Sequence, residues 1–588
     1  MFLSPMGRTV GMHVNIIPPL LRCAGQFLRQ NRENKAGMKT LLEFADEKML
    51  TRLLVKERAK CRKKNRDSKD HGLDKECALD DLKLAQQLSR MMPPRHTWVK
   101  PRRRKKLANG VSDRSRNAAR ALWLTIERDR KRRRKEGVEP DYLRELDGYV
   151  DRIRRRLTDG NLSLTAPRLI PILKDVTETK TEVNVMCRPL STYRELEDKI
   201  VLAVTSRYLT RYLDGMLHEN ILSYRAPRDF DGERMRVTDF NDGIRLIREY
   251  VKRHKGERIY AADCDIKKFY DIIPHRVVTE CFERMLAGTD LSQEGREQVM
   301  RVVRAYLKSY NFYENALRVA DEHREVFCKL NRRFARKQKT TTRWRRETKT
   351  VNYTLGWVDE LRGLTEEEKR QIGVPQGGAL SLLVANVVLN DVDRVIVEKQ
   401  DEARLFVRFC DDMILLHTDE QECRRLMEAY TDSLTRHGLY YHEMQNVGSA
   451  KVAEEGRRGE RTSRKFWKQK SHKTFLWGDG SGDSNRYIGF LGYEMRRDGR
   501  LRLRRSNIKR MEEKLRRVRY ALKRYSKRGG VTAEELREYC GRLVGNILDG
   551  VKFYRGLNLD AFKAGLQYRH LECKAKESCD GMMDEVRG

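Results

Sequence analysis

The chain has 588 residues, with 124 Lys and Arg against 86 Asp and Glu and a formal net charge of +38. This length allows several domains or one large core with attachments, and the strong positive charge favours a polyanionic partner over a solvated basic surface. No apolar run reaches 18 residues, and the first residues lack a secretory-signal core, so we expect no membrane span and a cytoplasmic protein. The 12 cysteines show no paired zinc-type spacing and are expected to be reduced packing residues.

A basic and mostly helical extension is predicted over residues 1–164. Between residues 102 and 135 there are fifteen Lys or Arg against three acids. This segment is either a solvated, partly disordered arm or a surface that follows phosphates, and we favour the second. A second basic segment, in an expected insertion at about 314–350, mixes cations with aromatic rings; this suits base stacking, with a surface loop as the alternative. The residues predicted to contact nucleic acid are Arg102, Arg103, Arg104, Arg132, Arg133, Arg134, Arg343, Trp344 and Arg345.

From about residue 165 short apolar runs alternate with amphipathic helical patterns. Residues 258–265 are typical of a strand, and apolar residues recur at helical spacing after residue 380. Two apolar runs, 405–410 and 413–417, are separated only by Asp411 and Asp412, which predicts a β-hairpin with two acids at its turn. Past residue 500 an apolar seam over 506–526 predicts a helix, and a capping box at 532–535 opens the next one.

The adjacent carboxylates Asp411 and Asp412 are the first candidates for chemistry. Two like charges beside an apolar sheet raise each other's pKa values unless a cation neutralises them, and Mg²⁺ takes oxygen ligands of this kind. A pair of metal ions needs a third carboxylate. Asp265, at the end of the predicted strand, is the candidate, and the Ile266 carbonyl could add a ligand. Asp263 and Asp271 are the rivals, and Asp271 is placed where it could cap the next helix or turn.

Five segments in order resemble the motifs of reverse transcriptases. DIKKFYDIIPH (265–275) resembles the first catalytic motif, and RFCDDMILL (408–416) resembles the Tyr-x-Asp-Asp motif, with Phe409 in the aromatic place. The other three are CRPLSTYRELEDKIV (187–201) for the fingers, GVPQGGALSLLVANVVLNDVD (373–393) for the Pro-Gln-Gly motif and its helix, and YIGFLGYEM (487–495) for the primer grip. The resemblance runs from about 165 to 560.

The resemblance implies an α+β right-hand polymerase with a helical, basic N-terminal extension. Residues 165–257 would form the fingers, 258–495 the palm, and 496–588 the helical thumb and tail. The implied metals are two Mg²⁺ ions, with Mn²⁺ also suitable, held by Asp265, Ile266, Asp411 and Asp412. The implied dNTP contacts are Lys180, Arg188, Tyr270, Gln376 and Gly377, where Tyr270 would exclude a ribose 2′-hydroxyl or, alternatively, only pack in the core. The implied primer grip is Phe490, Leu491, Gly492 and Tyr493.

Among reverse transcriptases the chain most resembles the bacterial "unknown group" enzymes, which are related to group II intron and retron enzymes and many of which are defence-associated. This implies a dedicated non-coding RNA as template or scaffold, dNTPs as substrates, and a DNA or cDNA product. The sequence departs from the family at Leu382, where many relatives have proline. It also lacks the usual lysine after Gly438-Leu439, so that only His442 or Lys451 could act as general acid.

Three other functions stay open on the sequence: an RNA-binding splicing cofactor or intron maturase, an RNA-dependent RNA polymerase, and a terminal transferase or protein-primed polymerase. The three acids together disfavour the first, and Tyr270 disfavours the second. Nothing in the sequence separates the third from a reverse transcriptase, since both would use the same metal site. The sequence predicts no oligomeric state.

Overall fold

A computed structural model describes most of the chain between residues 40 and 543. Several residues and segments named above lie outside the described residues: Lys180, the pair 103–104, most of the insertion at 314–350 with the segment 343–345, His442, Lys451, and most of the thumb and tail at 496–588 with nearly all of the expected helix 506–526. The described residues are 40–71, 75–102, 105–106, 114–178, 182–226, 228–229, 235–236, 238–318, 350–355, 363–399, 401–441, 475–478, 487–503, 522, 525, 532 and 534–543.

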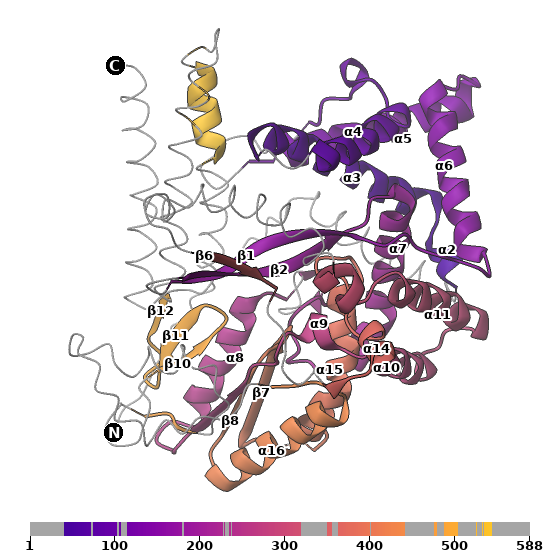
Figure 1. Cartoon of the computed structure of the whole chain (residues 1–588). Helices are drawn as coiled ribbons and strands as arrows, with labels where there is room; N and C mark the ends of the chain where they lie inside the picture. Colours follow the sequence, from indigo (N-terminus) through magenta and orange to yellow (C-terminus); the bar gives the residue numbers. More distant parts are fainter. Residues whose placement is uncertain are drawn as a thin grey trace, which may run out of the picture.

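The N-terminal region is a block of helices, at the top of Figure 1. α6 shows why it forms, because its apolar side chains recur every three or four residues and are buried, from Leu143 and Leu146 to Leu157. A capping box at Thr40 opens the first helix. The helices are α2 (Leu41–Phe44), α3 (Glu47–His71), α4 (Lys75–Arg90), α5 (Arg114–Glu136) and α6 (Asp141–Thr158), with a 3₁₀ turn at Arg95–Thr97.

A long hairpin and two helices lie between this block and the central sheet (Figure 1). β1 (Arg168–Glu178) and β2 (Glu182–Thr192) pair antiparallel, with a register shift between Leu173 and Asp175, and β6 (Thr350–Thr354) joins β2 in parallel. The other elements here are α7 (Leu196–Leu213), a 3₁₀ turn (Asp214–Met216), the short hairpin β3 (Arg228–Asp229) and β4 (Met235–Arg236), and α8 (Phe240–Arg253).

The central sheet has the strand order β7-β8-β5-β9, and all of its neighbours run antiparallel. Alternate side chains of its strands enter different cores. Phe406, Met413 and Leu415 pack in the core that contains α15 and α16, whereas Leu405, Ile414 and Leu416 pack in the core that contains α8 and β10–β12. Burial on both faces explains the continuous apolar runs. The strands are β5 (Tyr260–Cys264), β7 (Arg404–Phe409), β8 (Asp412–His417) and β9 (Phe475–Leu476).

Helices and a second small sheet surround the central sheet. The remaining elements are α9 (Phe269–Ile272), α10 (His275–Ala287), α11 (Gln293–Lys308), a π-helical turn (Tyr313–Arg318), α14 (Glu366–Arg370), α15 (Ser381–Val397), α16 (Glu420–Arg436), β10 (Tyr487–Phe490), β11 (Tyr493–Arg496), β12 (Leu501–Leu503) and a helix at 534–543. None of the described helices combines the length and the apolar character that crossing a bilayer requires.

One continuous core joins the N-terminal helices to the central part of the molecule. The same cluster of buried side chains includes Leu41 of α2, Tyr208 of α7 and Leu415 of β8. A hydrogen bond from the Leu42 backbone to the Gln298 side chain, 3.3 Å long, adds a polar link between α2 and α11. The expected boundaries at 164 and 257 therefore do not separate independent cores.

Several local predictions are confirmed. The helix after residue 380 is α15, and the two apolar runs around the acids form the β7–β8 hairpin. The segment that resembles a primer grip forms a second hairpin, β10–β11. The capping box is present, since Thr532 and Glu535 exchange 3.2 Å hydrogen bonds. The strand expected to run to residue 265 ends one residue earlier, at Cys264.

Candidate active site

The three candidate acids lie at one end of the central sheet. Phe409 pairs with Asp412 across the β7–β8 hairpin, and Cys264 pairs with Met413 across β5 and β8. Continuing that register by one residue places Asp265 opposite Asp412, on strands about 4.8 Å apart. Asp265 is partly exposed, with its Oδ2 atom buried, and Asp412 is exposed. The rival Asp263 lies inside β5, opposite Ile414, and is further from the turn.

The turn that carries Asp411 is held in a strained conformation. Cys410 has a φ of 59°, in the left-handed region, which costs a non-glycine residue about 1–2 kcal/mol. Two hydrogen bonds hold it, because the Cys410 backbone N–H donates to Ser223 Oγ at 2.8 Å and its carbonyl accepts from Arg408 Nη1 at 2.9 Å. The direction of the acid-bearing turn is thus fixed by side chains beneath it.

Arg408 belongs to a buried polar network behind the turn. Its guanidinium lies 2.7 Å from Asp393 Oδ2, and both side chains are at most 1% exposed. Burial raises the pKa of the Asp393 carboxyl to about 6, and the neighbouring Arg408 opposes that rise. Asn386 accepts from Arg408 at 3.3 Å and donates to the Ser223 carbonyl at 2.8 Å. The network therefore joins α15, β7 and the segment that holds Cys410.

Tyr270 and the 375–378 loop are tied together. The Val374 backbone N–H donates to the Tyr270 carbonyl at 2.8 Å, and Gln376 Nε2 donates to Asp271 Oδ1 at 2.6 Å. Burial raises the pKa of the Tyr270 hydroxyl, and the charges of Cys410 and Asp411 are further causes, so the ring is within electrostatic range of the acid turn. The structure brings Tyr270 and Gln376 to the same site.

The capping role considered for Asp271 is wrong. Asp271 lies inside α9 and is buried, whereas the N-cap positions of α9 and α10 are Lys268 and Pro274. Its carboxylate instead accepts the hydrogen bond from Gln376. Pro274 separates α9 from α10. Asp271 therefore lies within α9, where its side chain is buried, and not at the start of α10.

Gly377 lies against the end of β2. Leu190 and Gln376 form a parallel bridge, and the Ser191 N–H donates to the Gln376 carbonyl at 2.8 Å. Gly377 has a φ of 90°, and a Cβ there would lie 2.5 Å from Leu190 Cδ1, so only glycine fits. Arg188 is exposed two residues before Leu190, on the same face of β2.

The β10–β11 hairpin turns at Leu491 and Gly492. Both have positive φ values, 50° and 88°, as a two-residue type I′ turn requires. Phe490 and Tyr493 are buried, and the Tyr493 hydroxyl donates to Asn241 of α8 at 3.1 Å. Of the four residues predicted to grip a primer, Leu491 and Gly492 are therefore the ones that remain partly exposed.

Tyr224 was not predicted as a site residue. Its φ of 53° is unusual for a bulky side chain, and the residue is 43% exposed. Burial raises the pKa of its hydroxyl to about 12, with Cys410 as the second cause, and Tyr270 is also within electrostatic range of it. Tyr224 therefore lies near both the acid turn and Tyr270. Strained backbone of this kind concentrates at functional sites, but it leaves no mark in a single sequence.

Comparison with known protein families identifies the family that this site resembles. The model of a family described as "Reverse transcriptase (RNA-dependent DNA polymerase)" matches residues 323–445, which include Gln376, Asp411 and Asp412. Residues 323–445 therefore match a reverse transcriptase domain. The expectation of an RNA-directed DNA polymerase is thereby confirmed at the level of the family, and the mixed α/β structure with its N-terminal helices is consistent with a polymerase fold.

Solved structures similar to this chain include telomerases from Candida. Telomerase from Candida albicans, in complex with a fragment of telomeric RNA, is 14% identical with a TM-score of 0.31, and the alignment covers 76% of this chain and 64% of that one. Apo telomerase from Candida tropicalis is 12% identical with a TM-score of 0.34, covering 73% and 64%. This chain thus spans less than two thirds of either telomerase chain, and scores this low bear on neither function nor partners. No curated protein matches the chain.

Asp411 and Asp412, within the matched residues, and Asp265 suit a divalent metal, which reverse transcriptases typically use. Hard cations such as Mg²⁺ prefer carboxylate and carbonyl oxygens at a site that retains some water. Asp265 directly follows β5, Asp411 lies in the β7–β8 turn and Asp412 begins β8; each supplies such oxygens, and all three residues are at least partly exposed. The donor set present in this structure therefore fits the metal.

The basic residues of α5 are only partly available to nucleic acid. Arg133 forms 2.6 Å ion pairs with Glu139 and Asp147, and Arg132 pairs with Glu136 at 3.3 Å. These acids neutralise part of the positive charge of 132–134, and the contact of these arginines with nucleic acid stays a prediction. Arg134 is exposed, as is Arg102 in the segment before α5.

Proposed function

We propose that this protein is an RNA-directed DNA polymerase that makes cDNA by two-metal nucleotidyl transfer. The observation that carries the proposal is the register of the central sheet, which brings Asp265 to the acid turn at Asp411 and Asp412. In this proposal the chain has the right-hand polymerase architecture, with fingers over 165–257, the palm over 258–495 and the thumb after 496.

The acids would hold two Mg²⁺ ions, with the Ile266 carbonyl as a further ligand. Bound metal would lower the pKa of the primer 3′-hydroxyl and stabilise the leaving pyrophosphate. The role of the chain is to hold the carboxylates at fixed positions, through the Cys410 turn and the network beneath it. Fixed charges of this kind cost no reorganisation during the reaction.

The incoming nucleotide would lie between Tyr270, Gln376 and Gly377. Tyr270 would exclude a ribose 2′-hydroxyl, since its buried ring is within electrostatic range of the acid turn and its backbone is held by the Val374 N–H. Gln376 would meet the nucleotide with an amide whose orientation Asp271 sets. Arg188, exposed on the strand that contacts the 375–378 loop, would bind the triphosphate. The turn at Leu491 and Gly492 would hold the primer end.

We also infer that a dedicated non-coding RNA is the template or scaffold, in a bacterial antiphage system. The support is the resemblance of the motifs to defence-associated enzymes, together with the net charge of +38. Exposed cations such as Arg102 and Arg134 would contribute phosphate contacts. Sequencing of RNA and DNA that co-purify with the wild type and with an Asp412→Asn variant tests this inference. A preparation free of nucleic acid at low salt would contradict it.

The polymerase assignment is tested with Asp412→Asn and the matched control Asp432→Asn, an exposed acid on α16. Extension of a DNA primer on an RNA template, RNA binding and thermal unfolding are measured for both. We expect Asp412→Asn to lose extension while it keeps RNA binding and the unfolding temperature, and the control to match the wild type. Wild-type extension by Asp412→Asn would refute the metal site. Incorporation of rNTPs alone, or extension without a template, would replace the proposal with one of the other polymerase classes.

A further inference from the structure

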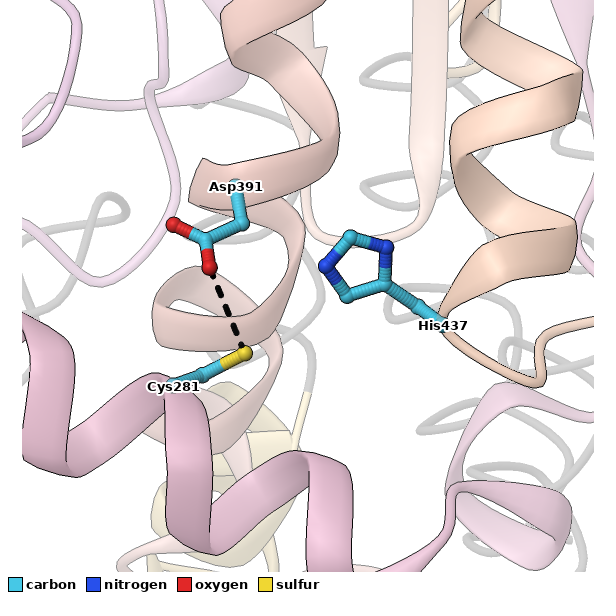
Figure 2. Close-up of side chains that lie close together, drawn as sticks. All are labelled: Cys281, Asp391 and His437. Atoms are coloured by element: carbon cyan, nitrogen blue, oxygen red, sulfur yellow. Dashed lines mark hydrogen bonds between the residues drawn. The ribbon is translucent and has the colours of Figure 1, made fainter.

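Three potential metal ligands, on α10, on α15 and directly after α16, lie close together where these helices pack. Figure 2 shows Cys281 of α10, Asp391 of α15 and His437, the residue that ends α16, directed toward one another. Each offers one ligand atom, and these atoms all lie within 4.8 Å of one another. We propose that Cys281, Asp391 and His437 form a binding site for a transition-metal ion, for which Zn²⁺ is the best fit.

The distance between the first two ligands suits a tetrahedral ion. Cys281 Sγ lies 3.6 Å from Asp391 Oδ2. In a tetrahedral zinc site, bonds of about 2.3 Å to sulfur and about 2.0–2.2 Å to oxygen place those two atoms roughly 3.5 Å apart. A mixed sulfur, nitrogen and oxygen set favours Zn²⁺ over Mg²⁺, which takes oxygen ligands. The metal that suits this cluster therefore differs from the metal that suits the acid turn.

His437 is oriented as a metal-bound histidine usually is. Its Nδ1 lies 2.7 Å from the Ser433 carbonyl oxygen. Because a carbonyl can only accept, Nδ1 carries the proton and the lone pair is on Nε2. Figure 2 shows that the other ring nitrogen faces Asp391. A backbone carbonyl that fixes the tautomer in this way is a common outer partner of zinc-binding histidines.

Arg284 also contacts the cluster. Its guanidinium donates to Asp391 Oδ2 at 2.6 and 3.0 Å and approaches Cys281 Sγ at 3.5 Å, while its side chain is 54% exposed. Metal binding would release the Cys281 thiol proton to solvent, and the guanidinium would move into water. Arg284 is thus a competitor of the ion, and water or a solvent anion would complete the coordination.

The ion would have a structural role near the active site. It would join α10, α15 and the end of α16. The chain continues from His437 to Tyr440, whose carbonyl accepts from the Lys267 N–H at 2.7 Å, and to Tyr441, which bridges Ile266. Ile266 and Lys267 are the residues that directly follow Asp265 in the chain. Occupancy would therefore hold the backbone on one side of the acids without contributing a ligand to the reaction.

The test uses the full chain loaded with Co²⁺ in place of Zn²⁺, because a cobalt–thiolate bond gives a near-ultraviolet charge-transfer band. We expect the band in the wild type and in two cysteine controls, Cys423→Ser on α16 and Cys573→Ser, which lies outside the described residues. We expect Cys281→Ser to lose it, and His437→Gln to bind Zn²⁺ at least about tenfold more weakly. Arg284→Ala should bind at least as tightly as the wild type.

Each outcome of this experiment bears on the site. A wild type without the band, or a band that persists in Cys281→Ser, would overturn the proposal. Loss of binding in Arg284→Ala would show that Arg284 builds the cluster rather than competes for it, and would also overturn it. If Cys281→Ser does not fold, the zinc content of His437→Gln tests the site. A zinc content equal to that of the wild type would overturn the proposal. Asp412→Asn should keep the band, so a failure of this proposal is distinguishable from a failure of the polymerase assignment.

Discussion

Replacing the buried pair Arg408 and Asp393 separates the stability of the fold from the positioning of the acids. Arg408→Met alone leaves the Asp393 carboxylate buried without its ion-pair partner, and losses of this kind cost about 3–5 kcal/mol. The double variant Arg408→Met/Asp393→Leu replaces the pair with apolar side chains, which is often neutral or stabilising. The single variant should therefore be much less stable than the wild type, and the double variant should recover most of that loss.

Turnover should not recover in the same way. Both variants lack the guanidinium that donates to the Cys410 carbonyl. A hydrogen bond from a charged donor is worth about 1.5–3 kcal/mol, which is similar to the cost of the left-handed conformation of Cys410. Without it the turn can relax and move Asp411 and Asp412. Because each tenfold change in rate corresponds to about 1.4 kcal/mol, we expect kcat to fall roughly ten- to a hundredfold in both variants.

Two assays on the same preparations check this reasoning. Urea unfolding gives the stability, and primer extension at saturating dNTP gives kcat, with the exposed substitution Arg276→Met on α10 as the control. A double variant that regained wild-type stability and wild-type turnover together would show that the network only stabilises the fold. A large rise in the KM for dNTP with unchanged kcat would show that the Arg408 network affects substrate binding and not the position of the acids.

Three further predictions concern the loop beside the acids. Gly377→Ala should abolish extension, because its Cβ would lie 2.5 Å from Leu190 Cδ1, and Leu190→Ala in the same chain should restore only part of it, since the backbone strain remains. Asp271→Leu should raise the KM for dNTP about tenfold or more by releasing the Gln376 amide, whereas Asp271→Asn, which keeps an acceptor, should change it less. Tyr270→Val should increase the incorporation of rNTPs relative to dNTPs in competition assays, and an unchanged ratio would assign this ring to core packing.

The parts of the fold that were predictable from the sequence are those fixed by local patterns. The hairpin around Asp411 and Asp412 follows from two apolar runs that are too short for helices, and α15 follows from apolar residues at helical spacing. The Leu491-Gly492 turn also has a local cause, because a two-residue hairpin needs positive φ values. In each case the information lies within about ten residues of chain.

The contacts that complete the site were not predictable, because they join residues far apart in the sequence. Gln376 and Asp271 are separated by 105 residues, and Asp391 and Cys281 by 110. One weak signal was present: Arg408 is a charge inside an apolar strand, and Asn386 and Asp393 are polar residues seven apart on an apolar helix. Such residues need buried partners, but only the fold shows that they partner one another.

The continuous core has a consequence for how this protein is made. α2 cannot complete its packing until α11 exists, because Leu42 bonds to Gln298, 256 residues later. At a synthesis rate of about 5–20 residues per second, the ribosome needs roughly 13–50 s to supply that partner. During this interval the apolar faces of the first helices are exposed on the nascent chain, where they can attract chaperones or associate wrongly.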